Sequence, residues 1–246
     1  MSTFLTGDTH GAFGRVEAWC DFIKTKKEER LVILGDAGIN YYGEVAEYEG
    51  RDEKLKKYLQ SLPITFFCVH GNHEQRPEHF SNYKLKKWNG GMVWVEEQFP
   101  SILFAKDGEI YEIEGQKTLV IGGAYSVDMN SRKMRKSRGI TKILEWWSDE
   151  QPSEEIKRTV EENLEKAGWK VDVVLSHTCP EKYLPTEAFL EGISQDTVDT
   201  STEKWLDKIE NKLTYQHWFC GHFHIEKKIG KLQFLFEDYV DFPEKA

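Results

Sequence analysis

Short apolar, β-branched or aromatic runs that stop abruptly at Gly, Asp, Asn or His recur along the chain, and they constrain its fold more than any other feature. Near-continuous apolar runs of this length are typical of β-strands that are buried on both faces of a sheet. The chain has 246 residues, enough for one large domain or two small ones. We therefore predict buried strands at six places, namely Thr3–Thr6, Leu31–Leu34, Ile64–Val69, Thr118–Ile121, Val171–Leu175 and Trp218–Cys220.

Helical patterns lie between these strands. Val16–Lys26 has its apolar residues three and four positions apart, and Glu53–Leu62 and Glu154–Ala167 show the same spacing. Ser153 is a suitable N-cap for the last of these helices, and Gly168 is a suitable stop. Strands that alternate with helices early in the chain predict an α/β fold with mixed sheets.

Turn signals in the middle of the chain predict a β-hairpin. Its strands are Ser101–Ala105 and Ile110–Ile113, and the Asp-Gly pair at 107 and 108 is a strong turn signal between them. A further strand is expected in Lys231–Phe236, where hydropathy alternates. Because no internal repeat or Pro/Gly-rich linker divides the sequence, we predict a single domain over residues 1–246, with elaborations at about 128–150 and 180–214.

The balance of charge limits the class of ligand. The chain has 33 basic and 42 acidic residues, which leave a net charge of −9. A protein that grips a nucleic-acid backbone over a broad surface needs clustered positive charge, so this balance argues against that class. It does not exclude a small anionic substrate held at a metal site, where the ions supply the positive charge.

Cysteine usage and the lack of long apolar runs bear on the compartment. No run approaches the ~18 consecutive apolar residues that span a bilayer, and the N-terminus lacks the basic start and long apolar run of a signal peptide. We expect buried free thiols rather than a zinc finger or a disulfide scaffold, because no CxxC pair occurs. A reducing cytoplasm fits these features. The cysteines are Cys20, Cys68, Cys179 and Cys220.

Side chains that bind metals follow five of the predicted strands. In an α/β sheet, ligands bind beyond the carboxyl ends of the strands, so residues distant in sequence meet there. Asp, Asn and His donors suit borderline and hard divalent ions such as Mn²⁺, Fe²⁺ or Zn²⁺. The five motifs are Gly7-Asp8-Thr9-His10-Gly11, Gly35-Asp36-Ala37-Gly38, Gly71-Asn72-His73-Glu74, Ser176-His177-Thr178 and Gly221-His222-Phe223-His224.

Spacing within the motifs supports this interpretation. Asp8 and His10 are two apart in extended chain and point the same way, as do His222 and His224. A carboxylate shared by two ions about 3.5–4 Å apart is the usual device for an in-line phosphoryl displacement. Each motif alone has an ordinary interpretation as a capped turn, a helix start or a polar residue at a sheet edge. Their joint occurrence, each at the end of a strand-like run, favours a metal centre.

In this order the motifs resemble those of the calcineurin-like metallophosphoesterases, over residues 7–224. The resemblance implies a four-layer α-β-β-α sandwich of two mixed sheets, and a hydrolase that cleaves phosphate mono- or diesters with a metal-activated water or hydroxide. His73 would contact the phosphate or protonate the leaving oxygen as a general acid. The implied metal ligands are Asp8, His10 and His224 for one ion, Asn72, His177 and His222 for the other, and Asp36 as the bridge between them.

The resemblance also implies a cofactor and a kind of partner. We expect two divalent metal ions, with Mn as the first choice and Fe, Zn or Ni as alternatives. The expected partner is a phosphate-ester substrate, and nucleic acid enters only as a substrate. The sequence implies no membrane and no partner protein.

Two departures separate the chain from the phosphoprotein phosphatase branch. Gly35-Asp36-Ala37-Gly38 lacks the Asp-Arg-Gly continuation of that branch, and His70 stands where the branch has an arginine. The chain is therefore more similar to the small bacterial and phage phosphoesterases. Two of the candidate substrate contacts outside the motifs have ordinary alternatives, which are a solvated basic face for Arg132 and a packing role for Tyr125. The candidates are Arg76, Tyr125 and Arg132.

Three alternatives to a general phosphoesterase stay open. The first is a nuclease, against which the net charge weighs mildly. The second is a phosphodiesterase acting on cyclic nucleotides or dinucleoside polyphosphates, because the same two-metal core serves monoesters and diesters. The third is an interaction module that keeps the scaffold without metal. All five motifs are intact, which argues against this last alternative.

Overall fold

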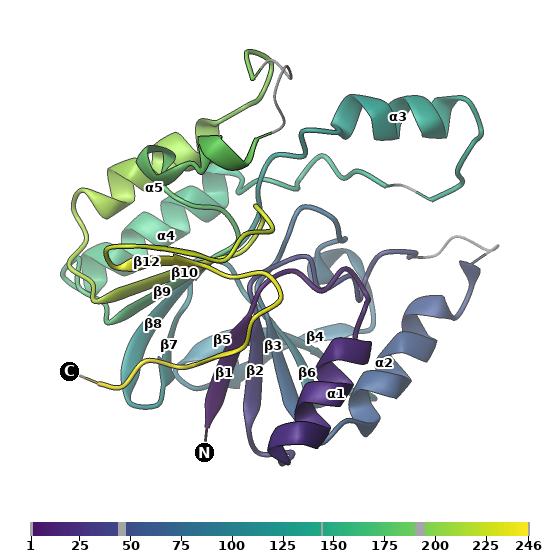
Figure 1. Ribbon diagram of the computed structural model, residues 1–246, viewed down its shortest axis with the longest axis horizontal. Helices are drawn as coiled ribbons and strands as arrows, with labels where there is room; N and C mark the ends of the chain where they lie inside the picture. The colour runs from purple at the N-terminus through teal and green to yellow at the C-terminus, as the bar shows by residue number, and fades with distance from the viewer. Residues whose placement is uncertain (1, 44–47, 144, 190–194, 246) are drawn as a thin grey trace.

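The computed structural model describes residues 2–43, 48–143, 145–189 and 195–245, and it has two β-sheets packed between helices (Figure 1). Both sheets contain parallel and antiparallel neighbours, so the predicted α/β fold with mixed sheets is confirmed. In spatial order, the first sheet consists of β13 (Val240–Asp241), β1 (Thr3–Thr6), β2 (Arg30–Ile33), β3 (Thr65–Cys68), β6 (Ile102–Ala105), β5 (Gly91–Glu96) and β4 (Tyr83–Trp88). The second consists of β11 (Lys227–Ile229), β12 (Leu232–Phe234), β10 (His217–Cys220), β9 (Val173–Ser176), β8 (Gln116–Ile121) and β7 (Ile110–Ile113).

Three apolar layers hold the sandwich together. The middle layer lies between the sheets and joins side chains such as Val32 of the first sheet and Val120 of the second in one buried cluster. Each sheet also has one further apolar cluster, which lies between its outer face and the helices that cover it. The predicted four-layer α-β-β-α sandwich is therefore confirmed. The outer helices are α1 (Gly14–Ile23) and α2 (Arg51–Ser61) on the first sheet, and α4 (Glu154–Lys166) and α5 (Ser201–Glu210) on the second (Figure 1).

Parallel pairing brings the ends of several strands to one edge. In the first sheet, Thr6 of β1 pairs with Ile33 of β2, and Ile33 pairs with Cys68 of β3. In the second sheet, Ile121 of β8 is level with Ser176 of β9. The loops after β1, β2 and β3 therefore begin at one level, as do those after β8 and β9. Four of the five metal-ligand motifs lie on the loops after β1, β2, β3 and β9, and the fifth follows β10, whose Phe219 pairs with Leu175 of β9.

The predicted hairpin at residues 107 and 108 is wrong, because its two strands belong to different sheets. β6 pairs with β3 and β5, whereas β7 pairs with β8. Asp107 is buried and accepts a hydrogen bond of 2.6 Å from Arg76. Gly108 has a φ of +83° and lies close to Val160 of α4. The Asp-Gly pair thus carries the chain from one sheet to the other instead of folding it back on itself.

A hairpin that we did not predict joins β4 and β5. Asn89 and Gly90 connect the two strands and have φ values of 46° and 89°. Positive φ at both central residues is what a type I′ turn needs, and Asn-Gly is its preferred sequence. The exposed strand β4 carries Lys84, Lys86 and Lys87, charges that protect a sheet edge from pairing with other chains.

The predicted boundaries agree best for α4, whereas α1 begins at Gly14 and ends at Ile23, three residues before the predicted end, because Lys24 adopts a left-handed φ of 61°. Ser153 caps α4 by accepting a hydrogen bond of 3.2 Å from the backbone N–H of Ile156, and Gly168 follows the helix with a φ of +66°. The four cysteines are free and buried, as expected. None of the helices in the described part of the chain has the length and apolar character that crossing a membrane requires.

The two elaborations contain structure that the sequence analysis did not predict. The first holds α3 (Met129–Ser137), which has no buried residue and stands apart from the sandwich (Figure 1). The second holds two short 3₁₀ turns, at Glu181–Tyr183 and Thr186–Ala188, followed by α5. Both elaborations lie at the edge of the sandwich that carries the metal-ligand motifs.

Candidate metal centre

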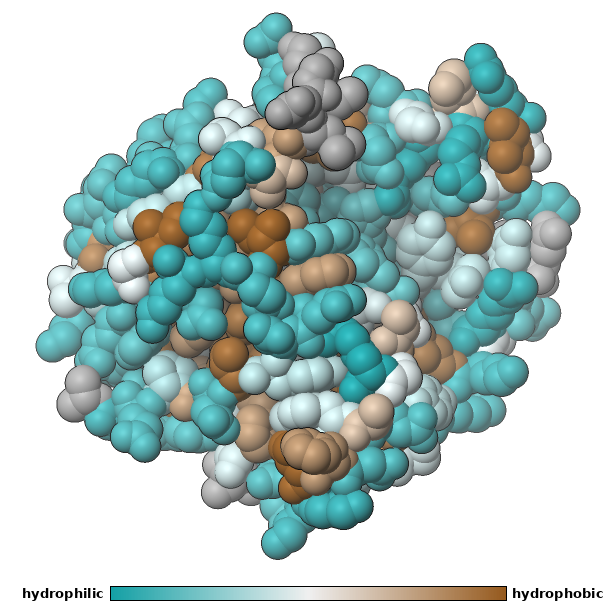
Figure 2. Space-filling model, viewed as in Figure 1, coloured by the Kyte–Doolittle hydropathy of each residue, from teal (hydrophilic) through white to brown (hydrophobic). Residues whose placement is uncertain are grey.

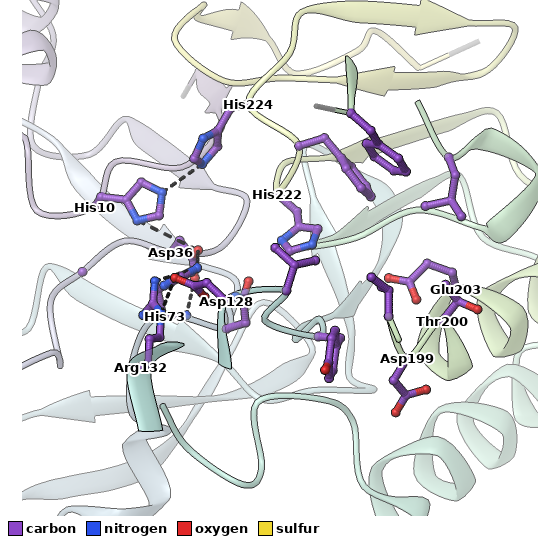
Figure 3. A pocket seen from close by; sticks show the side chains of 18 of the residues that line it. His10, Asp36, His73, Asp128, Arg132, Asp199, Thr200, Glu203, His222 and His224 are labelled. Atoms are coloured by element: carbon purple, nitrogen blue, oxygen red, sulfur yellow. Dashed lines mark hydrogen bonds and ion pairs between the residues drawn. The ribbon is translucent and has the colours of Figure 1, made fainter. Parts of the chain in front are cut away.

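The structure brings the seven predicted metal ligands together. They lie on the loops after β1, β2, β3, β9 and β10, which come from both sheets. Figure 3 shows His10, Asp36 and His73 turned toward one another, with His224 beside His10. His10 and His224 are 214 positions apart in the sequence, yet their Nε2 atoms are only 2.9 Å apart. Such convergence is what strand-end loops of an α/β sheet provide.

One group of donors consists of Asp8, His10 and His224, and their ligand atoms all lie within 4.8 Å of one another. Asp8 Oδ2 is 3.2 Å from Nε2 of His224 and 3.7 Å from Nε2 of His10. The same oxygen is buried and accepts no hydrogen bond of good geometry from the described residues. A buried, unsatisfied carboxylate oxygen is costly unless a cation or donor meets it, so this group fits a metal ion.

A second group consists of Asp8, Asp36 and His177. Nδ1 of His177 faces the carbonyl oxygen of Leu34 at 2.8 Å, so Nδ1 carries the proton and Nε2 offers a lone pair. This Nε2 lies 2.8 Å from Oδ1 of Asn72, whose amide nitrogen donates to another partner. Two acceptors at this distance repel each other unless a cation lies beside both. The pair therefore fits a shared metal ion.

His222 completes the cluster. Its ring lies edge-to-face with the ring of His177, with centroids 4.9 Å apart. Its backbone N–H donates a hydrogen bond of 2.9 Å to Oδ1 of Asp8. His222 thus contacts members of both groups, one through its ring and the other through its backbone.

Backbone strain is concentrated at these residues. Non-glycine residues with positive φ are uncommon, and when they cluster they mark sites where function requires an unusual turn. Four of the seven predicted ligands have positive φ, with values of 46° for His10, 49° for Asp36, 68° for His222 and 52° for His224. The surrounding sandwich holds these turns in place, and the turns aim the side chains at one point.

Two glycines allow the carboxylates to approach the neighbouring loops. A Cβ atom on Gly71 would lie 1.9 Å from Oδ1 of Asp36, and one on Gly221 would lie 2.3 Å from Oδ1 of Asp8. Any side chain at either position would displace the carboxylate. The glycines of the third and fifth motifs therefore form the walls against which the carboxylates of the second and first motifs rest.

Electrostatics in the centre also call for positive charge. Burial raises the pKa of Asp36 well above its ordinary value, and the nearby Asp8 carboxylate adds to this shift. Burial opposes ionisation of Asp8 as well, but the close contact with His224 and the other neighbouring histidines hold the pKa of Asp8 below its usual range. Burial lowers the pKa of His222 to about 3, so its ring is neutral and able to bind a metal. Divalent cations would remove the penalty on the two carboxylates.

His73 lies beside the ligands, with Arg132 next to it. The backbone N–H of His73 donates a hydrogen bond of 2.7 Å to Oδ1 of Asp36, and its Nε2 is 3.8 Å from Oδ2 of the same carboxylate. Arg132 belongs to α3, and its Nη2 approaches Nε2 of His73 to 3.4 Å. Asp128 and the carbonyl of Glu145 hold the guanidinium, at 2.6 and 2.7 Å. The arm that carries α3 therefore contributes a cation to the site.

The other two candidate substrate contacts differ from each other in placement. Tyr125 is partly exposed and lines the cleft above the ligands. Arg76 is 5% exposed and forms a salt bridge of 2.6 Å with Asp107, besides donating to the carbonyl of Asp149. It does not line the cleft. The prediction that Arg76 contacts substrate is therefore wrong, because its guanidinium pairs with Asp107 in the segment that joins the two sheets.

A cleft of about 1450 Å³ opens over the ligands. Figure 2 shows this side of the molecule hollowed between the α5 region and the α3 region. Residues on the far side of the cleft from Arg132 include Asp199, Thr200 and Glu203 (Figure 3). The floor consists of six predicted site residues, which are His10, Asp36, Asn72, His73, His222 and His224.

Sequence reasoning missed the residues that support the ligands. Ser126 accepts a hydrogen bond of 2.8 Å from the amide of Asn72, and its own N–H donates to Glu150. Glu74 is buried and accepts from the N–H groups of Gly38 and Gly71, so it ties the second motif to the third. The presence of Glu74 within a motif was a signal for its role. No signal pointed to Ser126, because its partner is distant in sequence.

A comparison with known protein families finds the same family that the motifs resemble. The family model described as calcineurin-like phosphoesterase matches residues 1–226. No curated protein matches the chain. The match covers all five motifs and all strands of the first sheet except β13.

Proposed function

The chain belongs to the calcineurin-like phosphoesterase family, and we propose that it hydrolyses phosphate mono- or diesters with the help of two divalent metal ions. The observation that carries the proposal is the convergence of Asp8, Asp36 and His177 with His10 and His224 at one edge of the sandwich. Residues with these donor types, buried and partly unsatisfied, fit divalent ions of the Mn, Fe, Zn or Ni kind, and Mn is our first choice.

Each ligand has a proposed place in the pair of sites. Asp36 contacts neighbours of both groups, because its Oδ1 is 3.7 Å from His177 and its Oδ2 is 4.0 Å from His10. It therefore suits the role of the bridge. When bound, the two ions supply the positive charge and the acidified water that phosphoester hydrolysis needs. The remaining ligands are assigned as Asp8, His10 and His224 for one ion and Asn72, His177 and His222 for the other.

His73 and Arg132 are proposed to act on the phosphate itself. Both line the cleft and lie within 3.4 Å of each other, so a phosphoryl group above Asp36 meets an imidazole and a guanidinium together. Burial and the adjacent Arg132 charge lower the pKa of His73 to about 2, so its ring is neutral before substrate binds. The negative charge of a bound phosphate favours protonation, which would let His73 deliver a proton to the leaving oxygen.

The proposal also assigns a substrate contact to Tyr125 and a cellular compartment to the protein. Tyr125 lies on the wall of the cleft and would pack against the alcohol portion of the ester. Four buried free cysteines support a reducing compartment such as the cytoplasm. Whether monoesters or diesters are preferred depends on the walls of the cleft rather than on the ligands.

Hydrolysis of two chromogenic esters tests the proposal. The purified protein with Mn²⁺ is expected to hydrolyse p-nitrophenyl phosphate or bis-p-nitrophenyl phosphate. Asp36→Asn and His73→Ala are each expected to remove most of this activity, whereas Asp21→Asn on the exposed face of α1 serves as a control with the same chemical change. Absence of turnover of both esters with every divalent ion, together with negligible metal content, would overturn the proposed function.

A further inference from the structure

Residues 127–142 form an arm whose helix is not stabilised by burial of its side chains. Its helix, α3, has no buried residue, and Figure 1 shows it projecting from the sandwich. Three apolar side chains on the arm are exposed, with relative exposures of 71% for Val127, 44% for Met134 and 64% for Ile140. Most helices in globular proteins are stabilised by burying an apolar face. Because α3 buries none of its residues, it lacks this stabilisation.

Charge on the arm is opposite to that of the rest of the protein. Residues 127–142 contain six basic side chains and one acidic side chain, whereas the rest of the chain has 27 basic and 41 acidic residues. Five of the basic side chains fall within the seven residues 132–138. Such a cluster attracts polyanions even when the net charge of the protein is negative. The net charge therefore does not exclude a nucleic acid as a substrate.

The cations of the arm continue outward from the catalytic centre. Arg132 meets His73, and Arg135 and Lys136 follow it by three and four positions on the next turn of α3. Residues at these spacings share one face of a helix. Arg135 is half exposed and 3.3 Å from Glu145, while the ammonium of Lys136 bonds to a backbone carbonyl and forms no salt bridge with an acidic residue of the described part of the chain.

The cleft is larger and more aromatic than a site for a small ester needs. Its volume of about 1450 Å³ exceeds the ~300–1000 Å³ of typical small-molecule sites. Aromatic side chains line it, and stacking of single-stranded bases on such rings is a general mode of recognition. The rings belong to Tyr41, Tyr42, Tyr125, Phe189 and Phe223.

We propose that the physiological substrate is a single-stranded nucleic acid, cleaved at one phosphodiester in the metal centre while neighbouring phosphates bind the cations of α3 and bases stack on the aromatic walls. The inference rests on the proposed function. Water adds to phosphorus as the bond to the leaving sugar oxygen breaks, and the leaving oxygen takes a proton. A duplex is not favoured, because its paired bases cannot stack on the rings of the cleft.

A comparison of two substrates and two triple variants tests the inference. The substrates are a short single-stranded oligonucleotide and bis-p-nitrophenyl phosphate, both with the Mn²⁺-loaded protein. The arm variant combines Arg135→Ser, Lys136→Ser and Arg138→Ser. The control combines Lys84→Ser, Lys86→Ser and Lys87→Ser on the exposed strand β4, which removes the same charge. Circular dichroism melts check that both variants fold.

The arm variant is expected to lower the ratio of kcat/KM for the oligonucleotide to kcat/KM for the small diester by at least about tenfold. It should also reduce the slope of log kcat/KM against log salt by about 2, since three phosphate contacts are lost. The control is expected to change neither quantity. Equal behaviour of the two variants would overturn the inference.

Three other outcomes separate the inference from the function. Turnover of the small ester without cleavage of the oligonucleotide would overturn the inference and leave the proposed function standing. Faster turnover of a phosphopeptide than of the oligonucleotide would do the same. Failure to hydrolyse any of these substrates would overturn the proposed function and the inference together.

Discussion

Replacing Gly71 with alanine is expected to inactivate the enzyme without unfolding it. The new Cβ would lie 1.9 Å from Oδ1 of Asp36 and 2.1 Å from its backbone nitrogen. Contacts below 3.0 Å are essentially never seen, so the carboxylate or its loop must move by about 1.1 Å. Overpacking of this size costs about 1–3 kcal/mol of unfolding free energy. A displacement of about 1 Å at reacting groups lowers the rate by about a hundredfold.

Gly14→Ala is the matched control. A Cβ at Gly14 meets nothing within 4 Å, and the residue begins α1 without a positive φ. This variant is expected to be as active as wild type and slightly more stable, by about 0.4–1 kcal/mol, because alanine restricts the unfolded chain.

Three measurements on both variants test whether the close contact with Gly71 fixes the position of Asp36. They are urea unfolding followed by circular dichroism, kcat for bis-p-nitrophenyl phosphate with Mn²⁺, and calorimetric titration with Mn²⁺. We expect Gly71→Ala to lose activity and bind Mn²⁺ more weakly while Gly14→Ala changes neither. Activity of Gly71→Ala within about threefold of wild type, with unchanged Mn²⁺ affinity, would refute the idea that the close contact with Gly71 fixes Asp36.

Further predictions concern the support of the site and the stability of the fold. Ser126→Ala removes the acceptor that orients the Asn72 amide, and is expected to weaken Mn²⁺ binding by about 10–100-fold in calorimetry; unchanged affinity would contradict this role. Lys56→Met leaves the buried Glu96 carboxylate without its cation, and is expected to cost about 3–5 kcal/mol of unfolding free energy in urea; a cost below about 1 kcal/mol would show that the pair is dispensable. Burial raises the pKa of Glu203 above 4.5, so the folded protein holds this proton more tightly than the unfolded chain, and stability falls as the pH rises above 4.5 until it passes the folded-state pKa. Glu203→Gln is expected to flatten this fall in a series of thermal melts, and an identical pH profile would contradict the assignment.

The sequence was sufficient for the strands that carry the metal-ligand motifs, because each such motif is local. β1 and β3 were expected from their apolar runs, and the glycines and ligands that follow them identify the edge of the sheet. Parallel pairing then brings the ends of these strands to one level without further information. The family match agrees with the order of the motifs.

The pairing of strands that are not defined by a local motif could not be predicted in the same way. The Asp-Gly pair at 107 and 108 is a hairpin signal, but β6 already has a partner in β5, so the chain crosses to the other sheet. The neighbouring Asn-Gly pair at 89 and 90 does form a hairpin, and it was not recognised because β4 has an exposed, lysine-rich pattern. α3 lacks an apolar stripe, so periodicity gave no signal for it.

Side-chain partners outside the motifs were the least predictable. Arg76 follows the third motif closely, which suggested a substrate contact, yet its guanidinium pairs with Asp107 from a distant loop. Arg132 was one of several basic residues in a run, and only the path of α3 brings it to His73. A single sequence does not specify which member of such a run reaches the site.

The most direct test of the central claim is electron paramagnetic resonance of the protein titrated with Mn²⁺. Five strand-end loops that converge on a shared Asp36 are expected to hold two ions per chain close enough for magnetic coupling. We therefore expect a stoichiometry of two and an exchange-coupled spectrum, which Asp36→Asn converts to the signal of isolated ions or abolishes. A protein that binds no Mn²⁺, or that shows only isolated ions at saturation, would contradict the claim of a two-metal centre.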